Sequence, residues 1–96
     1  MHIISKKALK DFWDEYPDSR IPLLTWFKIV KASKYASFNH LRATFKTADK
    51  VRDKIVFNIG GNKYRLVTLI YFNYGRVYVR HVLTHEEYEK GGWKHG

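Results

Sequence analysis

The spacing of apolar residues changes near residue 54, and this change constrains the fold more than any other feature. Before it, apolar residues recur at helical spacing in "KKALKDFWDEYP", "IPLLTWFKIVKAS" and the shorter "SFNHLRATF". After it come three runs rich in Ile, Val, Tyr and Phe: "KIVFNI", "KYRLVTLIYF" and "RVYVRHVL". The turn sequences "GGN" and "NYG" separate these runs, so they predict three antiparallel strands in a meander.

Residues that typically begin or end helices and strands complete the predicted order of elements. An apolar segment at residues 2–5 predicts a short strand, and Pro17 ends the first helix. The tight connection after it predicts a second helix antiparallel to the first, whereas residues 46–54 are expected to form a polar, basic loop and the last residues a short polar tail. The chain therefore predicts a single α+β domain, residues 1–96, in the order β-α-α-(short α)-β-β-β with a C-terminal turn of helix. Its helices would cover one face of a small, mainly antiparallel sheet and leave the other for function.

Charge is the strongest compositional signal. Lys and Arg number 18 against 9 Asp and Glu, which gives a formal net charge of +9 and a pI near 9.9. Such an excess favours a partner that carries phosphates, or an acidic protein, over a membrane surface. The chain has no cysteine and no apolar run of about 18–20 residues that could span a bilayer, so a soluble, cytoplasmic protein is expected.

Two arginines lie within the predicted strands. Arg65 shares a strand face with Val67 and Leu69, and Arg80 is flanked by Val79 and His81. Each arginine could pair with a carboxylate at the sheet rim, or its planar guanidinium could bind a phosphate.

Basic and polar residues also surround the predicted turns. "NIGGNKYR" matches no dinucleotide or Walker pattern, so its glycines indicate a hairpin turn, with Asn62 and Lys63 at the edge of any ligand. The loop at 46–54 is either a solvated surface or a rim that contacts phosphates. Its candidate RNA-binding residues are Lys50, Arg52 and Lys54.

The spacing H-x3-H at His81 and His85 resembles half of a helical zinc site. The residues between them continue a β run, which would point the two rings in different directions, so no metal is predicted. Thr84 and Glu87 instead have the spacing of a capping box, which would open a helical turn at His85 and place Tyr88 one turn later. Because histidine titrates nearest neutrality, His85 is the first candidate for acid–base chemistry.

Together, "VFNIGGNKYRLV" and "VYVRHVLTHEEYEK" resemble the HigB toxin family, a branch of the RelE-like toxins of type II toxin–antitoxin modules. The resemblance covers essentially the whole chain. It implies a metal-independent endoribonuclease without a cofactor that cleaves mRNA, in most relatives on the ribosome. It also implies neutralisation by a HigA-like antitoxin with a helix-turn-helix domain.

Matched by position, the family's functional residues fall on Arg65, Arg80, His85 and Tyr88, with His81 a less secure match. The arginines would stabilise charge on the phosphate, and the histidine or tyrosine would transfer protons. Two other functions stay open from the residues alone: a noncatalytic RNA- or DNA-binding module, and a domain that binds an acidic protein.

Overall fold

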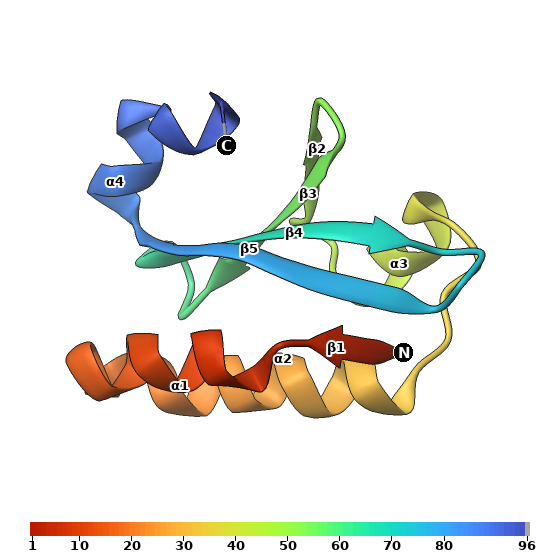
Figure 1. The fold of residues 1–96 in the computed structure, drawn as a ribbon, viewed down its shortest axis with the longest axis horizontal. Helices are drawn as coiled ribbons and strands as arrows, with labels where there is room; N and C mark the ends of the chain where they lie inside the picture. Colours follow the sequence, from red (N-terminus) through yellow and green to blue (C-terminus); the bar gives the residue numbers. More distant parts are fainter. Residues whose placement is uncertain (96) are drawn as a thin grey trace.

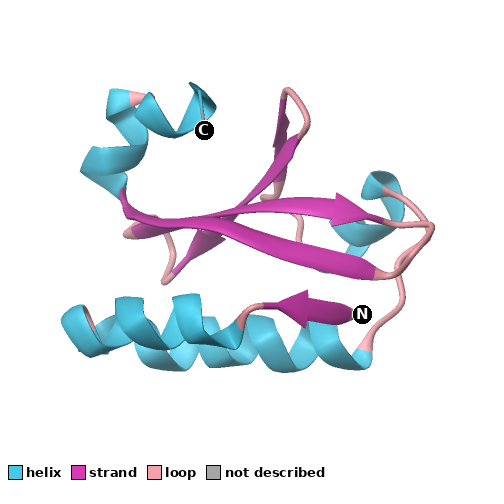
Figure 2. Ribbon diagram, in the orientation of Figure 1, coloured by secondary structure: helices cyan, strands magenta, loops and turns pink. Residues whose placement is uncertain are grey.

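A computed structural model describes residues 1–95 of the chain, which have an α+β fold (Figures 1 and 2). No helix within these residues is long and apolar enough to cross a membrane. The elements, in chain order, are β1 (His2–Ile4), α1 (Lys6–Glu15), the 3₁₀ turn η1 (Pro17–Ser19), α2 (Arg20–Ala32), α3 (Phe38–Thr44), β2 (Asp49–Val51), β3 (Lys54–Ile59), β4 (Tyr64–Tyr71), β5 (Arg76–Thr84), α4 (His85–Lys90) and η2 (Gly92–His95).

The five strands form one sheet in the order β1-β5-β4-β3-β2. β3, β4 and β5 pair antiparallel, which confirms the predicted meander, and β1 pairs parallel with β5 at the sheet edge. The predicted turn glycines Gly60 and Gly75 both have positive φ, the left-handed backbone that glycine adopts without steric cost. The predicted fold class and the order of its main elements are therefore confirmed.

The prediction of a loop over residues 46–54 is wrong in part. Asp49–Val51 form β2, which pairs antiparallel with β3, whereas β3 begins at Lys54, where the run "KIVFNI" predicts a strand to begin. β2 is an edge strand with a partner on one side only, and its three residues, two charged and one valine, are too few to show an alternation of apolar side chains. A sequence pattern that relies on burial has no signal there.

Helices α1 and α2 lie antiparallel against one face of the sheet, as predicted, and α3 packs at its far end (Figure 1). Trp26 of α2 meets Phe57 of β3 edge to face, with 5.4 Å between ring centroids. Fully buried aliphatic side chains fill the rest of this layer, among them Leu9, Leu23, Val30, Leu41, Leu66 and Val77. This core supplies most of the apolar burial that stabilises the sheet.

The second face, here called the open face, carries Arg65, Val67, Leu69 and Tyr71 of β4. It is only partly covered. Trp93, in the segment predicted to be a polar tail, is 5% exposed and packs with Val56 and Val67 in a second small cluster. The tail prediction is therefore wrong at Trp93, because a single large aromatic side chain folds the C-terminus back onto the sheet.

Candidate functional site

Arg65 is the centre of a polar cluster on the open face, next to the turn that joins β3 to β4. Its side chain is almost wholly buried, with the residue 7% exposed. Nη1 donates to the carbonyl oxygens of Asn62 (3.1 Å) and Tyr64 (3.2 Å), and Nη2 donates to the side-chain oxygen of Asn62 (2.7 Å). A buried guanidinium is costly unless its donors are satisfied, and the turn containing Asn62 supplies most of the required acceptors.

The remaining Nη2 hydrogen of Arg65 points to His85, with 3.2 Å between Nη2 and Nδ1. Arginine has no acceptor, so Nδ1 must accept this hydrogen bond. The network therefore assigns His85 a neutral ring with its proton on Nε2, which lies 3.3 Å from the carboxylate of Glu89. The Nδ1 lone pair of a neutral imidazole is the atom that can act as a general base.

Local sequence explains how His85 reaches Arg65. The Thr84 hydroxyl accepts from the backbone N–H of Glu87 (3.2 Å), and the Glu87 carboxylate accepts from the backbone N–H of Thr84 (2.9 Å). This confirms the predicted capping box, which begins α4 directly after β5. The backbone N–H of His85 also donates to the carbonyl of Lys63 (2.9 Å), so the start of α4 is joined to the same turn that holds Arg65.

Tyr88 lies over the other side of the guanidinium. The Arg65 guanidinium carbon lies 5.3 Å from the centre of the Tyr88 ring, within the range of a cation–π contact. Behind it, the Trp93 ring stacks on Tyr88 with centroids 4.9 Å apart, and the indole N–H donates to the Tyr88 carbonyl (3.0 Å). Burial is the main cause that raises the pKa of Tyr88, so the phenol is protonated at neutral pH and can donate a hydrogen bond.

The structure thus brings together Arg65, His85 and Tyr88 of the five candidate catalytic residues. Among the described residues, no hydrogen bond, ion pair or cation–π contact joins Arg80 or His81 to this cluster. In the pairing of β4 with β5, Val67 lies opposite His81 and Thr68 opposite Val79, which leaves Arg80 as the extra residue of a bulge. Arg80 is exposed and lines a hollow on the open face, farther from α4.

His81 lies half-buried next to the bulge. Its Nε2 is buried without a hydrogen-bond partner among the described residues. Burial is the main cause that lowers the pKa of His81, and the positive charges of Arg80 and Lys54 lower it further. His81 is therefore neutral at neutral pH.

The candidate RNA-binding residues occupy three different environments. Lys50 and Arg52 are exposed at the β2–β3 hairpin, whereas only 10% of the Lys54 side chain is accessible. Lys63 is exposed and forms an ion pair with Asp18, with 2.7 Å between Nζ and Oδ2. Asn62 uses its oxygens to hold Arg65, which makes it a residue that positions the site.

Two residues of the cluster do not figure in the sequence predictions. Glu89 lies four residues after His85 on α4, and that helical spacing could have indicated the pair. Trp93 supports Tyr88 from behind, and its signal was the presence of a large aromatic side chain in an otherwise polar tail. Within residues 1–95, no group of three or more His, Cys, Asp or Glu side chains is arranged to hold a metal ion.

Comparisons with known proteins connect this geometry to a family. The HigB toxin family, described as the RelE-like toxic component of a toxin–antitoxin system, matches residues 19–91. The mRNA interferase toxin HigB of Escherichia coli (strain K12) is 37% identical over 92 residues, which cover 93% of this chain and 88% of that protein. The mRNA interferase HigB of Shigella flexneri has the same identity and coverage. A further mRNA interferase HigB, from Escherichia coli O6:H1, is 32% identical over 93 residues, which cover 94% of this chain and 90% of that protein.

The family match includes α2, the three strands of the meander and α4. This chain therefore belongs to the HigB toxin family.

Proposed function

We propose that this protein is a toxin that cleaves mRNA without a metal ion, through the cluster of Arg65, His85 and Tyr88. The observation that carries this proposal is the contact between the buried Arg65 guanidinium and the Nδ1 lone pair of His85. It places a fixed positive charge beside a neutral imidazole on the partly covered open face of the sheet. The family membership and the names of the relatives support the same activity.

The chemistry that fits these groups is attack of the ribose 2′-oxygen on the adjacent phosphorus. His85 takes the 2′-hydroxyl proton at Nδ1, a 2′,3′-cyclic phosphate forms, and the bond to the 5′-oxygen breaks. Tyr88, which is protonated at neutral pH, donates its proton to the departing 5′-oxygen. The Arg65 charge stabilises the negative charge that builds up on the phosphoryl oxygens.

Substrate binding would also release the base. Four of the five N–H donors of Arg65 are engaged, two by oxygens of Asn62, one by the carbonyl of Tyr64 and one by His85. An incoming phosphate oxygen competes for the N–H that His85 accepts, since hydrogen bonds to an anionic acceptor are stronger than those to a neutral one. The same event therefore positions the phosphate and frees Nδ1 to accept a proton. Arg80 would contribute positive charge along the path of the RNA, and neither Arg80 nor the neutral His81 would transfer the proton.

The remaining parts of the module follow from the family. We infer that the mRNA is cleaved in the cytoplasm during translation on the ribosome, and that a HigA-like antitoxin with a helix-turn-helix domain neutralises the toxin. Lys50 and Arg52 at the β2–β3 hairpin would contact phosphates of the RNA. The net charge of +9 supports a partner rich in phosphates.

Controlled expression in a bacterial host tests the proposal. The wild-type chain should arrest growth and cleave cellular mRNA, and His85→Ala should abolish both effects at equal protein level. His2→Ala is the matched control, because His2 is an exposed histidine on β1 that pairs with Arg76, at the end of β5 remote from His85. If the wild-type and His85→Ala proteins both arrest growth and neither cleaves mRNA, the protein is instead a noncatalytic binding module.

A further inference from the structure

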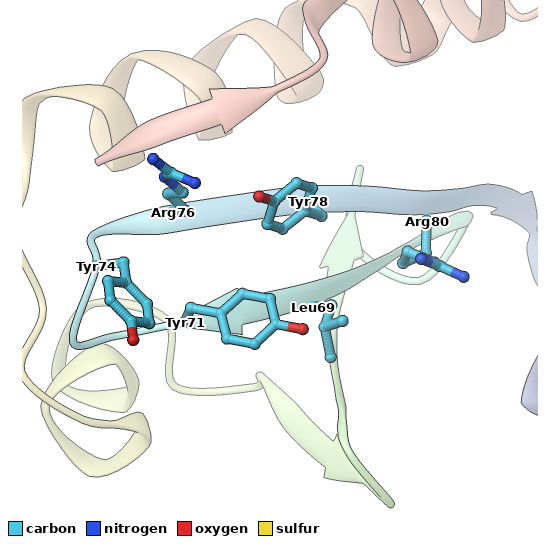
Figure 3. Close-up of a pocket in the computed structure, with 6 residues that line it drawn as sticks. All are labelled: Leu69, Tyr71, Tyr74, Arg76, Tyr78 and Arg80. Atoms are coloured by element: carbon cyan, nitrogen blue, oxygen red, sulfur yellow. The ribbon is translucent and has the colours of Figure 1, made fainter.

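A hollow of about 330 Å³ lies on the open face, at the end of the β4–β5 hairpin remote from His85 (Figure 3). The proton-transfer chemistry proposed above does not use it. β4 and β5 supply the residues of its walls, and the turn between them closes one end. Its lining residues are Leu69, Tyr71, Tyr74, Arg76, Tyr78 and Arg80.

Tyrosine rings dominate this hollow. Tyr71 and Tyr78, from neighbouring strands, meet edge to face with ring centroids 5.7 Å apart. Tyr71 is 46% exposed and Tyr74 is 77% exposed. Exposed aromatic rings held side by side on a sheet are the kind of platform on which unpaired nucleic acid bases stack.

The charged residues of the hollow are all basic. Arg76 and Arg80 are exposed, and no ion pair or hydrogen bond joins their guanidinium groups to the side chains described for residues 1–94. A neighbouring hollow shares Leu69 and Tyr71 and adds Lys50 and Arg52 from the β2–β3 hairpin, together with one carboxylate, Asp53. The combination of free cations and exposed rings is complementary to a strand that offers phosphates and bases in alternation.

The hollow lies on the same face of β4 as the candidate active site, and Val67, buried against Trp93, separates the two regions. Arg65, Val67, Leu69 and Tyr71 lie on one face of a regular strand, so Tyr71 is about 20 Å from Arg65 at roughly 3.3 Å per residue. Arg80 is the bulge residue of β5 beside Val67 and Thr68 of β4, and its side chain points away from Tyr71 and Tyr78 (Figure 3). A single strand that crosses the Arg65 cluster and passes over Trp93 along this face would reach the tyrosines within a few nucleotides.

We propose that the Tyr71–Tyr78 hollow binds bases of single-stranded RNA that flank the cleaved bond, with Arg76 and Arg80 contacting the adjacent phosphates. This inference rests on the proposed function, because it assumes that RNA lies across the Arg65 cluster. An acidic protein segment would bind the arginines through its carboxylates, without bases to stack on the tyrosine rings. The contribution of the tyrosine rings to affinity therefore distinguishes single-stranded RNA from an acidic protein.

The test compares two labelled probes of about 12 nucleotides, within the span covered by single-strand binding sites. One is a 2′-O-methylated RNA, which cannot be cleaved, and the other has the same phosphates but lacks the bases. Tyr71→Ala and Tyr78→Ala should each weaken binding of the first probe by about 5- to 150-fold, the range expected for one lost stacking contact. Binding of the second probe should change by less than about twofold. Arg76→Ala should weaken both probes alike.

The controls separate stacking from folding and from charge. Tyr71→Phe keeps the ring and should keep the preference for bases, and Arg20→Ala removes an exposed arginine from α2 without affecting that preference. Thermal unfolding by circular dichroism checks that each variant is folded. Equal affinity of the wild-type protein for the two probes would overturn the proposal, and so would Tyr71→Ala and Tyr78→Ala proteins that bind RNA normally.

Failure of this inference is distinguishable from failure of the proposed function. Cleavage of mRNA in a translation extract, compared between wild-type and His85→Ala proteins, reports only on the chemistry. If the wild-type protein cleaves mRNA but Tyr71→Ala and Tyr78→Ala bind RNA normally, the proposed function stands and the proposal of base binding in the hollow is wrong. If Tyr71→Ala abolishes base-dependent binding but the wild-type protein does not cleave mRNA, the proposed cleavage is wrong and the proposal of base binding in the hollow stands.

Discussion

The side chain of Arg65 combines three features that lysine does not offer: a planar fork, five donors and a face that stacks on Tyr88. Replacing it with lysine keeps the charge and tests whether these features matter. Arg65→Lys should lower the rate of mRNA cleavage by about 100-fold or more, since loss of a preorganised donor at a reacting oxyanion has effects of that size. The free energy of unfolding should fall by about 1–3 kcal/mol, because acceptors of the β3–β4 turn lose their donors.

Arg42→Lys is the matched control for this change. Arg42 is exposed on α3 and donates one hydrogen bond, to the carbonyl of Lys46 (3.2 Å). It should change neither cleavage nor stability measurably. Cleavage by Arg65→Lys within about threefold of wild type would contradict a specific role for the guanidinium.

His81 should make the fold sensitive to acid. Its folded pKa lies below the ordinary value of 6.5, chiefly through burial, so the unfolded chain binds this proton more readily. The contribution is therefore fully present above about pH 6.5 and is lost as the pH falls through the folded pKa. His81→Gln, which cannot titrate, should lose less stability than wild type between about pH 7.5 and pH 5 in urea unfolding experiments. An identical loss in both proteins would mean that His81 is as easily protonated in the folded chain as in the unfolded one.

At the scale of the element, α4 is a short helix whose six residues depend on their capping box. An isolated helix of this length does not persist in water, so its position on the sheet depends on the two cap hydrogen bonds and on Trp93. Because α4 carries both His85 and Tyr88, loss of the cap should affect activity more than stability.

Thr84→Ala tests this coupling. It should lower the free energy of unfolding by about 1 kcal/mol, the usual cost of an N-cap, and lower mRNA cleavage by about tenfold or more. Ser37→Ala removes the equivalent cap of α3, where the Ser37 hydroxyl accepts from the backbone N–H of His40 (3.1 Å). That variant should lose similar stability but retain cleavage. Equal mRNA cleavage by Thr84→Ala and Ser37→Ala would show that the cap of α4 does not position His85 and Tyr88.

The same scale explains which elements the sequence could predict. β3, β4 and β5 alternate or concentrate branched and aromatic residues between turn sequences, so their predicted bounds differ from the observed ones by a residue or less at each end. β2 has no buried residue to produce such a pattern. The bulge at Arg80 depends on how two strands pair, and single-strand periodicity cannot reveal it.

The candidate site was predictable only where spacing along one element determines it. The capping box fixed the relation of His85 to Tyr88, since both lie on α4. The contacts of Arg65 with Asn62 and of Tyr88 with Trp93 arise from the turn geometry and from the folding of the C-terminus onto the sheet. Neither has a period in the sequence, so both required the three-dimensional structure.

At the scale of the whole molecule, the positive charge should make RNA affinity depend steeply on salt. Each phosphate that the protein neutralises releases counterions, and the logarithm of the affinity falls with the logarithm of the salt concentration by about 0.7 per contact for single strands. Binding of the 2′-O-methylated RNA should therefore weaken strongly between about 50 and 200 mM salt. Arg52→Ala, at the exposed β2–β3 hairpin, should reduce the slope by about 0.7 if this residue contacts one phosphate.

Tyr71→Ala, which leaves the charge of the protein unchanged, is the control for the effect of Arg52→Ala on the salt dependence of binding. It removes a stacking surface and no charge, so it should weaken binding at every salt concentration and leave the slope unchanged. Arg52→Ala should do the reverse, with a shallower slope and an affinity that approaches the wild-type value at high salt. A slope that does not differ between wild type and Arg52→Ala would exclude the hairpin from the RNA path. The basic charge would then act from the remainder of the open face, where Arg76 and Arg80 lie.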